Sequence, residues 1–305
     1  MASLSFTASA AVACKRAKDA FSGRRPQISL ITDFGNGDEA VYAIRSAARN
    51  ILPRAEISDI CHDVPLGNLL VGAWRLRRAA GLPTEAPGTA YVAVVDPGVG
   101  GDRRNLIIRT KDGHFLIGPD NGVLSLASSQ KGVERAVEVR NEGLTLLHLA
   151  QSRTFHGKDV FAPAAAHVLR GVPLEEFGPE IDPATLARIT ISADATERSR
   201  AGCLVDIDGF GSVRTNVPNH IPEEAIGRPV EFGITGPKPV SGRARVVRTF
   251  AEAERDEPVF VLSSTGCLDL AVNLGSASGH FGISHEHIGV GRDLRPVSTI
   301  ELKLS

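Results

Sequence analysis

The chain has 305 residues, more than one hydrophobic core usually serves, so its length predicts two domains. Its 34 Lys and Arg residues nearly balance its 35 Asp and Glu residues. This balance argues against a nucleic-acid partner, gives no support for binding to an anionic membrane, and favours a small, uncharged or zwitterionic ligand.

Residues 1–26 differ in composition from the rest, being rich in Ala and Ser and carrying mostly basic charges. This composition favours a flexible arm. The charges follow the apolar stretch, which is the wrong order for a secretory signal, although an organelle transit peptide stays open. The four cysteines form no CxxC pair, so we expect a reducing cytoplasm. No apolar run reaches the roughly 18 residues of a membrane helix.

Strand-like and helix-like segments alternate over 27–190, which predicts an N-terminal α/β domain. The strands are nearly continuous apolar runs, typical of a mostly parallel sheet covered on both faces in a sandwich-like arrangement. A stretch at 178–200, with prolines and many polar residues, is typical of a linker. We expect strands at 28–32, 56–60, 89–95, 105–109 and 114–117, and helices at 38–50, 66–80 and 160–169.

The pattern changes from residue 202 onward, where short strands alternate with Gly and Pro turns and leave little room for helices. This pattern predicts a smaller all-β domain over 191–305, a small barrel or sandwich, of which we expect the barrel. The strands are predicted at 202–207, 230–234, 244–249, 259–262 and 299–303.

Two aspartates are candidates for chemistry because each follows a buried strand. Asp96 ends the strand at 89–95 and precedes a glycine-rich turn, and the carboxyl edge of an open α/β sheet is where such folds bind ligands. Asp33 holds the matching position after the first strand, where a carboxylate can accept both hydroxyls of a ribose. The alternative for Asp96 is a turn aspartate before proline.

The loop at 35–40 satisfies GxGxxA, with Asp59 about 20 residues further on, as a dinucleotide-binding fold requires. Its charges count against that function, because Asp33, Asp38 and Glu39 would all meet a pyrophosphate there. Asp38 is better explained as a favourable charge at a helix N-terminus.

Histidines supply the remaining candidates. His156 precedes a glycine where a polar loop enters an apolar helix, and it is either functional or a capping or core residue. For His62 a capping or core role is favoured over a functional one. His285 and His287 lack a third metal ligand, so no metal site is predicted.

Seven motifs together carry a family resemblance that spans about residues 28 to 305. In order and spacing the chain resembles the S-adenosylmethionine hydrolase and halogenase family. The motifs are ITDFG at 31–35, CHDVP at 61–65, VVDPGVG at 94–100 followed by Arg103, GPDNG at 118–122, TFHGKDVFAP at 154–163, IDGFGSVRTN at 207–216 and SSTGCLDLAVNLGSAS at 263–278.

The resemblance implies a catalytic triad of Asp96, Arg103 and His156, the set found in the hydrolase branch. In the halogenases the position of Asp96 looks like tyrosine, and the pair His156 and Gly157 is replaced by what resembles tyrosine-serine or a similar dipeptide. Val99 stands at a position that looks like threonine in the fluorinating enzymes. The implied activity is hydrolysis of S-adenosylmethionine to adenosine and methionine. A halogenase and a nucleoside-binding protein without turnover stay open as alternatives.

The implied reaction is attack at the ribose C5′, which expels a neutral thioether and needs no general acid. Asp96 would orient the water or take its proton, Arg103 would anchor Asp96, and His156 would be a second water contact or a proton relay. Neither a metal nor a cofactor is expected.

The resemblance also implies substrate contacts and an assembly. Asp33 would bind the ribose diol, and similar enzymes are homotrimers with sites at subunit interfaces. Two residues depart from the family pattern, because Ser212 replaces an asparagine and Asp269 a glutamate. The implied substrate-binding residues are Asp33, Phe155 and Gly157 in the α/β domain, and Asp208 (methionine ammonium; alternatively a turn residue), Ser212, Ser264 (carboxylate), Asp269 and Leu274 (adenine, through its backbone) in the β domain.

Overall fold

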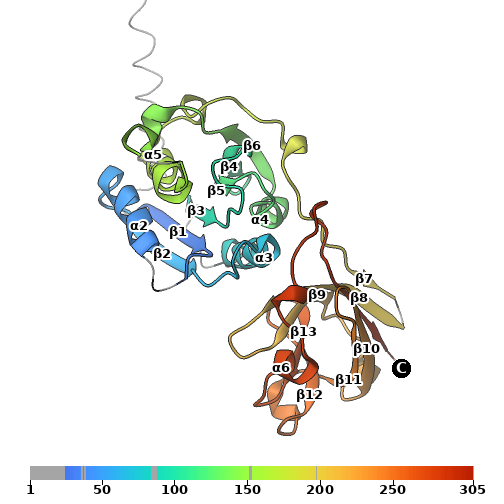
Figure 1. Cartoon of the computed structure of the whole chain (residues 1–305). Coiled ribbons are helices and arrows are strands. Elements are labelled where there is room, and N and C mark those ends of the chain that lie inside the picture. Colours follow the sequence, from blue (N-terminus) through green and yellow to red (C-terminus); the bar gives the residue numbers. More distant parts are fainter. Residues whose placement is uncertain are drawn as a thin grey trace, which may run out of the picture. The chain divides into compact units, whose positions relative to one another are not determined.

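A computed structural model describes residues 25–35, 37, 39–83, 88–150, 153–196 and 198–304. Apart from Arg25 and Pro26, the predicted arm lies outside the described residues. The chain divides into two compact units, with the boundary between Arg188 and Ile189 (Figure 1). In the part of the chain that is described, no helix has the length and apolar character needed to cross a membrane.

The first unit contains a six-stranded sheet in the order β2-β1-β3-β5-β4-β6. Strands β2, β1, β3 and β5 run parallel, whereas β4 is antiparallel to both of its neighbours. The predicted mostly parallel α/β sheet is therefore confirmed. The strands are β1 (Gln27–Thr32), β2 (Glu56–Cys61), β3 (Ala90–Val94), β4 (Asn105–Thr110), β5 (Phe115–Pro119) and β6 (Val133–Glu138).

Helices cover both faces of this sheet. Helix α2 (Glu39–Ile51) packs with α5 (Ala162–Leu169) on one side, and α3 (Leu69–Ala80) packs with α4 (Ser125–Lys131) on the other (Figure 1). Alternating strand residues supply the core under α2 and α5, because successive side chains point to opposite faces. One row of these residues crosses the sheet and is almost fully buried: Leu30, Val92, Ile117, Ile107 and Val137.

Local signals explain where the helices begin. The predicted helix at 66–80 starts only at Leu69, because the Asn68 side chain accepts a hydrogen bond from the Val71 amide and caps it. The helix predicted at 160–169 is preceded by a π-helical turn at Gly157–Phe161. Single 3-10 turns complete this unit at Glu142–Leu144, Leu147–Leu149, Leu174–Glu176 and Pro183–Thr185.

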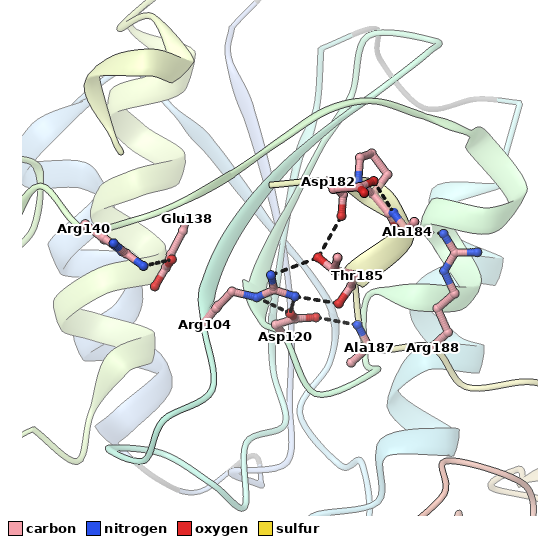
Figure 2. Close-up of polar contacts among 10 residues, drawn as sticks. Arg104, Asp120, Glu138, Arg140, Asp182, Ala184, Thr185, Ala187 and Arg188 are labelled. Atoms are coloured by element: carbon pink, nitrogen blue, oxygen red, sulfur yellow. Dashed lines mark hydrogen bonds and ion pairs between the residues drawn. The ribbon is translucent and has the colours of Figure 1, made fainter. Parts of the chain in front are cut away.

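The first part of the predicted linker is bound to the first unit. Arg104 pairs with the buried Asp120 carboxylate and donates to the Thr185 carbonyl at 2.7 Å (Figure 2). Asp120 in turn accepts a hydrogen bond from the Ala187 amide at 2.8 Å. Proline and polar residues resemble a solvated linker in sequence, but here they meet partners that lie more than sixty positions earlier in the chain.

The second unit is a closed seven-stranded barrel in the order β14-β10-β11-β12-β13-β9-β8, which the pairing of β14 with β8 closes. The two-residue strand β7 extends the sheet beside β8. The predicted barrel is confirmed, although β9 and β13 were not predicted. The elements are β7 (Asp194–Ala195), β8 (Ser199–Ile207), β9 (Val213–Pro218), β10 (Pro229–Thr235), β11 (Val240–Val247), β12 (Pro258–Leu262), β13 (Cys267–Val272), β14 (Thr299–Lys303), helix α6 (Ala277–Phe281) and 3-10 turns at Glu223–Ala225, Phe250–Glu252 and His285–His287.

Candidate active site

Asp33 and Asp96 lie at the same edge of the sheet, because β1 and β3 are parallel neighbours and each aspartate follows the end of its strand. Burial raises the pKa of Asp33 above its ordinary value, and the charge of Asp96 acts in the same direction. The Gly67 amide opposes this effect by donating to Asp33 Oδ2 at 2.8 Å. The two carboxylates therefore share one electrostatic environment.

Asp96 is held by a bidentate ion pair with Arg103. The Arg103 Nε donates to Asp96 Oδ1 at 3.0 Å, and Nη2 donates to Oδ2. The side chains of Asp96 and Arg103 are only 4% and 10% exposed, so the pair is shielded from bulk water. Such a fork orients a carboxylate firmly, because two parallel bonds fix both of its oxygens.

His156 joins the same cluster through its Nδ1 atom, which lies 2.8 Å from Arg103 Nη2. The guanidinium has no acceptor and never gives up its proton at ordinary pH, so Nδ1 must be the acceptor. The ring is then neutral, with its proton on Nε2. Burial, followed by the charge of Arg103, lowers the pKa of His156 below its ordinary value of 6.5, which agrees with a neutral ring.

Asn105 completes the cluster and was not predicted. Its Oδ1 accepts a hydrogen bond of 2.5 Å from Arg103 Nη1 and lies 3.3 Å from His156 Nδ1. The guanidinium also lies 5.7 Å from the ring centroid of Phe161. Arg103 is therefore held by contacts on several sides. An asparagine at the first position of a strand carries no sequence pattern that would have singled it out.

Gly157 allows the segment after His156 to approach the sheet closely. A Cβ atom at this position would lie 3.1 Å from Ile44 Cδ1 and 3.2 Å from Val94 Cγ1. The neighbouring Phe155 packs edge-to-face on Phe34, with ring centroids 5.8 Å apart. The loops that follow β1 and precede the π-helical turn are thus in direct contact, so Phe155 and Asp33 belong to one region.

Four of the five predicted residues of the second unit, all except Asp269, lie around two different turns. Asp208 Oδ1 accepts hydrogen bonds of 3.0 Å from the Phe210 and Ser212 amides, so it does act as a turn residue. The segment after β13 joins this turn, because the Ser278 amide donates to the Gly211 carbonyl at 2.9 Å.

Leu274 lies in that segment, in the left-handed region at φ 57°, and is 74% exposed. Ser264 instead occupies the exposed turn before β13. It therefore lies at the opposite end of this strand from Leu274. Asp269 lies within β13, opposite Arg214 of β9.

Asp59, the acidic residue of the GxGxxA hypothesis, is engaged elsewhere. It pairs with Arg45, and its Oδ1 lies 3.1 Å from His62 Nε2. The structure therefore gives Asp59 a role inside the fold. His287 is buried, with Nε2 3.0 Å from the Lys238 carbonyl. Among the residues described, no group of three or more His, Cys, Asp or Glu side chains is arranged to hold a metal.

A cavity of about 400 Å³ in the first unit lies away from this cluster. Leu106, Ser125 and Arg188 are among the residues that line it, and none of the predicted site residues does. This cavity and the cluster of Asp96, Arg103 and His156 therefore do not coincide. The cluster of Asp96, Arg103 and His156 remains the candidate active site because its charges are buried and mutually oriented.

The fold and the cluster together define a class: a two-domain α/β enzyme whose carboxylate, fixed cation and neutral imidazole can direct a nucleophile at the carboxyl edge of a sheet. Residues 28–178 match the SAM hydroxide adenosyltransferase N-terminal domain, and residues 202–288 match the corresponding C-terminal domain. The chain belongs to the SAM hydroxide adenosyltransferase family, which confirms the resemblance drawn from the seven motifs.

Relatives of known name agree with this membership. A (R)-S-adenosyl-L-methionine hydrolase of Salinispora tropica is 34% identical over 261 residues, covering 85% of this chain and 95% of that protein. The enzyme of the same name from Thermus thermophilus is also 34% identical over 261 residues, covering 84% and 95%. A fluorinase of Nocardia brasiliensis is 27% identical over 283 residues, covering 84% and 93%.

A solved structure, an uncharacterized conserved protein from Thermotoga maritima, has a TM-score of 0.76 at 30% identity. It covers 90% of this chain, which in turn covers 99% of it. The fold described here therefore extends over nearly the whole length of that protein.

Proposed function

We propose that this protein hydrolyses S-adenosyl-L-methionine to adenosine and L-methionine, and that Asp96, Arg103 and His156 direct the attacking water. The single observation that carries the assignment of roles is the buried, bidentate pair of Asp96 and Arg103 with His156 Nδ1 on the same guanidinium. Relatives named (R)-S-adenosyl-L-methionine hydrolase support the choice of substrate.

The proposed step forms one bond and breaks one. Water oxygen bonds to the ribose C5′ while the C5′–S bond breaks and its electron pair goes to sulfur, giving neutral methionine thioether. One water proton is released, first toward Asp96 and then to solvent. The sulfonium loses its positive charge as the bond breaks, so a pocket with little bulk water favours the reaction.

The hydrogen bonds give the Asp96 carboxylate and the His156 imidazole different roles in holding the water. Arg103 engages one lone pair on each Asp96 oxygen, which leaves the others to accept a hydrogen bond from water. His156 Nδ1 is engaged by Arg103, so Nε2–H donates to the same water. His156 is thus a second water contact that holds the oxygen in line, and a proton relay through Nδ1 is not part of the proposal.

Substrate binding is proposed to use both units. Asp33 would accept the ribose hydroxyls, with Phe155 packing on the ribose or adenine and Gly157 letting the backbone come close. Asp208, Ser212, Ser264, Asp269 and Leu274 would serve the methionine and adenine portions. No cofactor and no metal enter this scheme, since the leaving group needs neither protonation nor Lewis-acid activation.

A homotrimer with sites at subunit interfaces is proposed as the working assembly, in the cytoplasm. Cyclic symmetry with heterologous contacts would pair the α/β unit of one subunit with the barrel of the next. Light scattering on the active enzyme is expected to give three times the monomer mass of 32.3 kDa. A monomer with full activity would refute shared sites.

Product analysis tests the function. Purified protein is incubated with S-adenosyl-L-methionine in chloride-free and in chloride-containing buffer, beside an Asp96→Ala control, and the nucleosides are separated by chromatography. We expect adenosine in both buffers and none with the control. Formation of 5′-chloroadenosine only with chloride would identify a halogenase, and tight binding of adenosine without product would identify a nucleoside-binding protein.

A further inference from the structure

His62 lies in the buried layer beneath the candidate ribose site and has no part in the mechanism above. His62 is 5% exposed and Thr32, the last residue of β1, is 0% exposed. His62 Nδ1 lies 3.0 Å from Thr32 Oγ1, and Nε2 lies 3.1 Å from Asp59 Oδ1. Both ring nitrogens therefore face a polar atom.

The partners fix the direction of these contacts. Asp59 also pairs with Arg45, and a carboxylate paired in this way is an acceptor, which favours the ring tautomer with its proton on Nε2. Nδ1 then accepts the hydroxyl proton of Thr32. The Thr32 oxygen keeps lone pairs free and accepts the Phe34 amide at 3.3 Å. Hydrogen bonds thus link Phe34 to Thr32 and Thr32 to His62, and the other ring nitrogen of His62 lies 3.1 Å from Asp59 Oδ1.

This chain of bonds holds both sides of Asp33. Thr32 precedes Asp33, and Phe34, which follows it, is tied to the same hydroxyl. The next residue, Gly35, donates its amide to the His62 carbonyl at 2.6 Å. The loop therefore cannot shift relative to His62 without breaking buried hydrogen bonds, and breaking these is costly.

We propose that His62, acting through Thr32, is a positioning residue that sets the Asp33 carboxylate for the ribose hydroxyls. The proposal rests on the ribose contact assigned to Asp33 in the proposed function. It predicts that breaking the Thr32–His62 bond weakens recognition of the ribose diol while leaving the Asp96, Arg103 and His156 cluster in place, since the hydrogen bonds described above for that cluster do not involve His62.

The test compares adenosine with 2′-deoxyadenosine, which lacks one of the two ribose hydroxyls, by calorimetry on the full-length protein. Thr32→Val removes the hydroxyl at nearly constant shape, and Thr32→Ser restores it. Thr110→Val is the matched control, because Thr110 is equally buried, hydrogen-bonded through its hydroxyl, and at the end of the antiparallel strand β4, the opposite edge of the sheet.

We expect Thr32→Val to reduce the preference for adenosine by about tenfold, the effect of losing one buried hydrogen bond. Thr32→Ser and Thr110→Val should keep the preference, and kcat should stay within about twofold in all three because none of these substitutions removes a hydrogen bond of the Asp96, Arg103 and His156 cluster. An unchanged preference in Thr32→Val would overturn the proposal.

Two further variants test the direction of the bonds. His62→Asn keeps an acceptor near the Nδ1 position, whereas His62→Gln keeps a donor near Nε2, so the asparagine variant should retain more of the preference for adenosine. Equal loss in both would contradict the role of Thr32.

Asp33→Ala separates the ribose contact of Asp33 from the positioning role of His62. If Asp33→Ala keeps the preference for adenosine, the ribose contact itself is wrong, and the role of His62 is refuted with it. If Asp33→Ala loses the preference and Thr32→Val does not, only the positioning role is refuted.

Discussion

Replacing Arg103 with lysine separates the charge of this residue from its shape. Arg103 donates to both oxygens of Asp96, to Asn105 and to His156 from a single planar group. A lysine ammonium keeps the positive charge but is a point charge that cannot span these partners. Asp96 would still have a positive charge beside it, yet its carboxylate would no longer be held in one orientation.

The expected loss of activity in Arg103→Lys can be worked out from the hydrogen bonds that the lysine cannot make. Lysine can replace one or two of these four donated bonds, so at least two of them are lost. Hydrogen bonds to charged groups contribute about 1.5–3 kcal/mol each, and two of them at the lower end amount to about 3 kcal/mol. If this loss falls on the transition state, kcat drops by about 100-fold, since each 1.4 kcal/mol is a factor of ten.

Steady-state adenosine formation by Arg103→Lys gives kcat and KM, and thermal unfolding monitors the fold. We expect kcat to fall by about two orders of magnitude with KM changed by less than about threefold, because Arg103 has no proposed contact with substrate. Asn105→Ala is the milder companion variant, since it removes a single bond to the same guanidinium. Full activity in Arg103→Lys would refute the claim that the fork orients Asp96.

Three more predictions follow from the geometry. The pKa of His156 is lowered below 6.5, so hydrolysis should decline only as pH falls below 6.5 through that pKa, and His156→Gln, which keeps a donor near Nε2, should lack this acid limb in a pH–rate profile. Gly157→Ala should lower the free energy of unfolding by about 1 kcal/mol through overpacking, whereas Gly209→Ala, whose added Cβ meets nothing within 4 Å, should not; equal melting temperatures would contradict this. Asp120→Ala should release the segment before the domain boundary, and faster hydrogen exchange at the Ala187 amide would confirm it, while unchanged exchange would not.

Much of the candidate site follows from the sequence because the strand ends are clear. The run at 89–95 is mostly apolar and has no charged residue, so Asp96 is recognisable as the first charged residue at a sheet edge. Arg103 and His156 could be joined to it only through the family resemblance, since 53 positions separate them from each other. Asn105 was not predicted because its role depends on the contact between Arg103 and His156, which are distant in sequence.

The elements that were missed have weak local patterns. Helix α4 has seven residues, three of them serine, too few for a helical period to stand out. Strand β9 reads VRTNVP and derives its stability from pairing with β8 and β13, whose register no local pattern specifies. The ion pair of Arg104 and Asp120, which binds the segment before residue 188, likewise depends on contacts between distant parts of the chain.

The attack of water on the ribose C5′ can be followed by running the reaction in ¹⁸O-labelled water. Mass spectrometry then measures the masses of the two products. If Asp96 directs the water, we expect one ¹⁸O atom in the 5′-hydroxyl of adenosine, unlabelled methionine, and neither product with Asp96→Ala. Unlabelled adenosine, or labelled adenosine formed at an undiminished rate by Asp96→Ala, would contradict it.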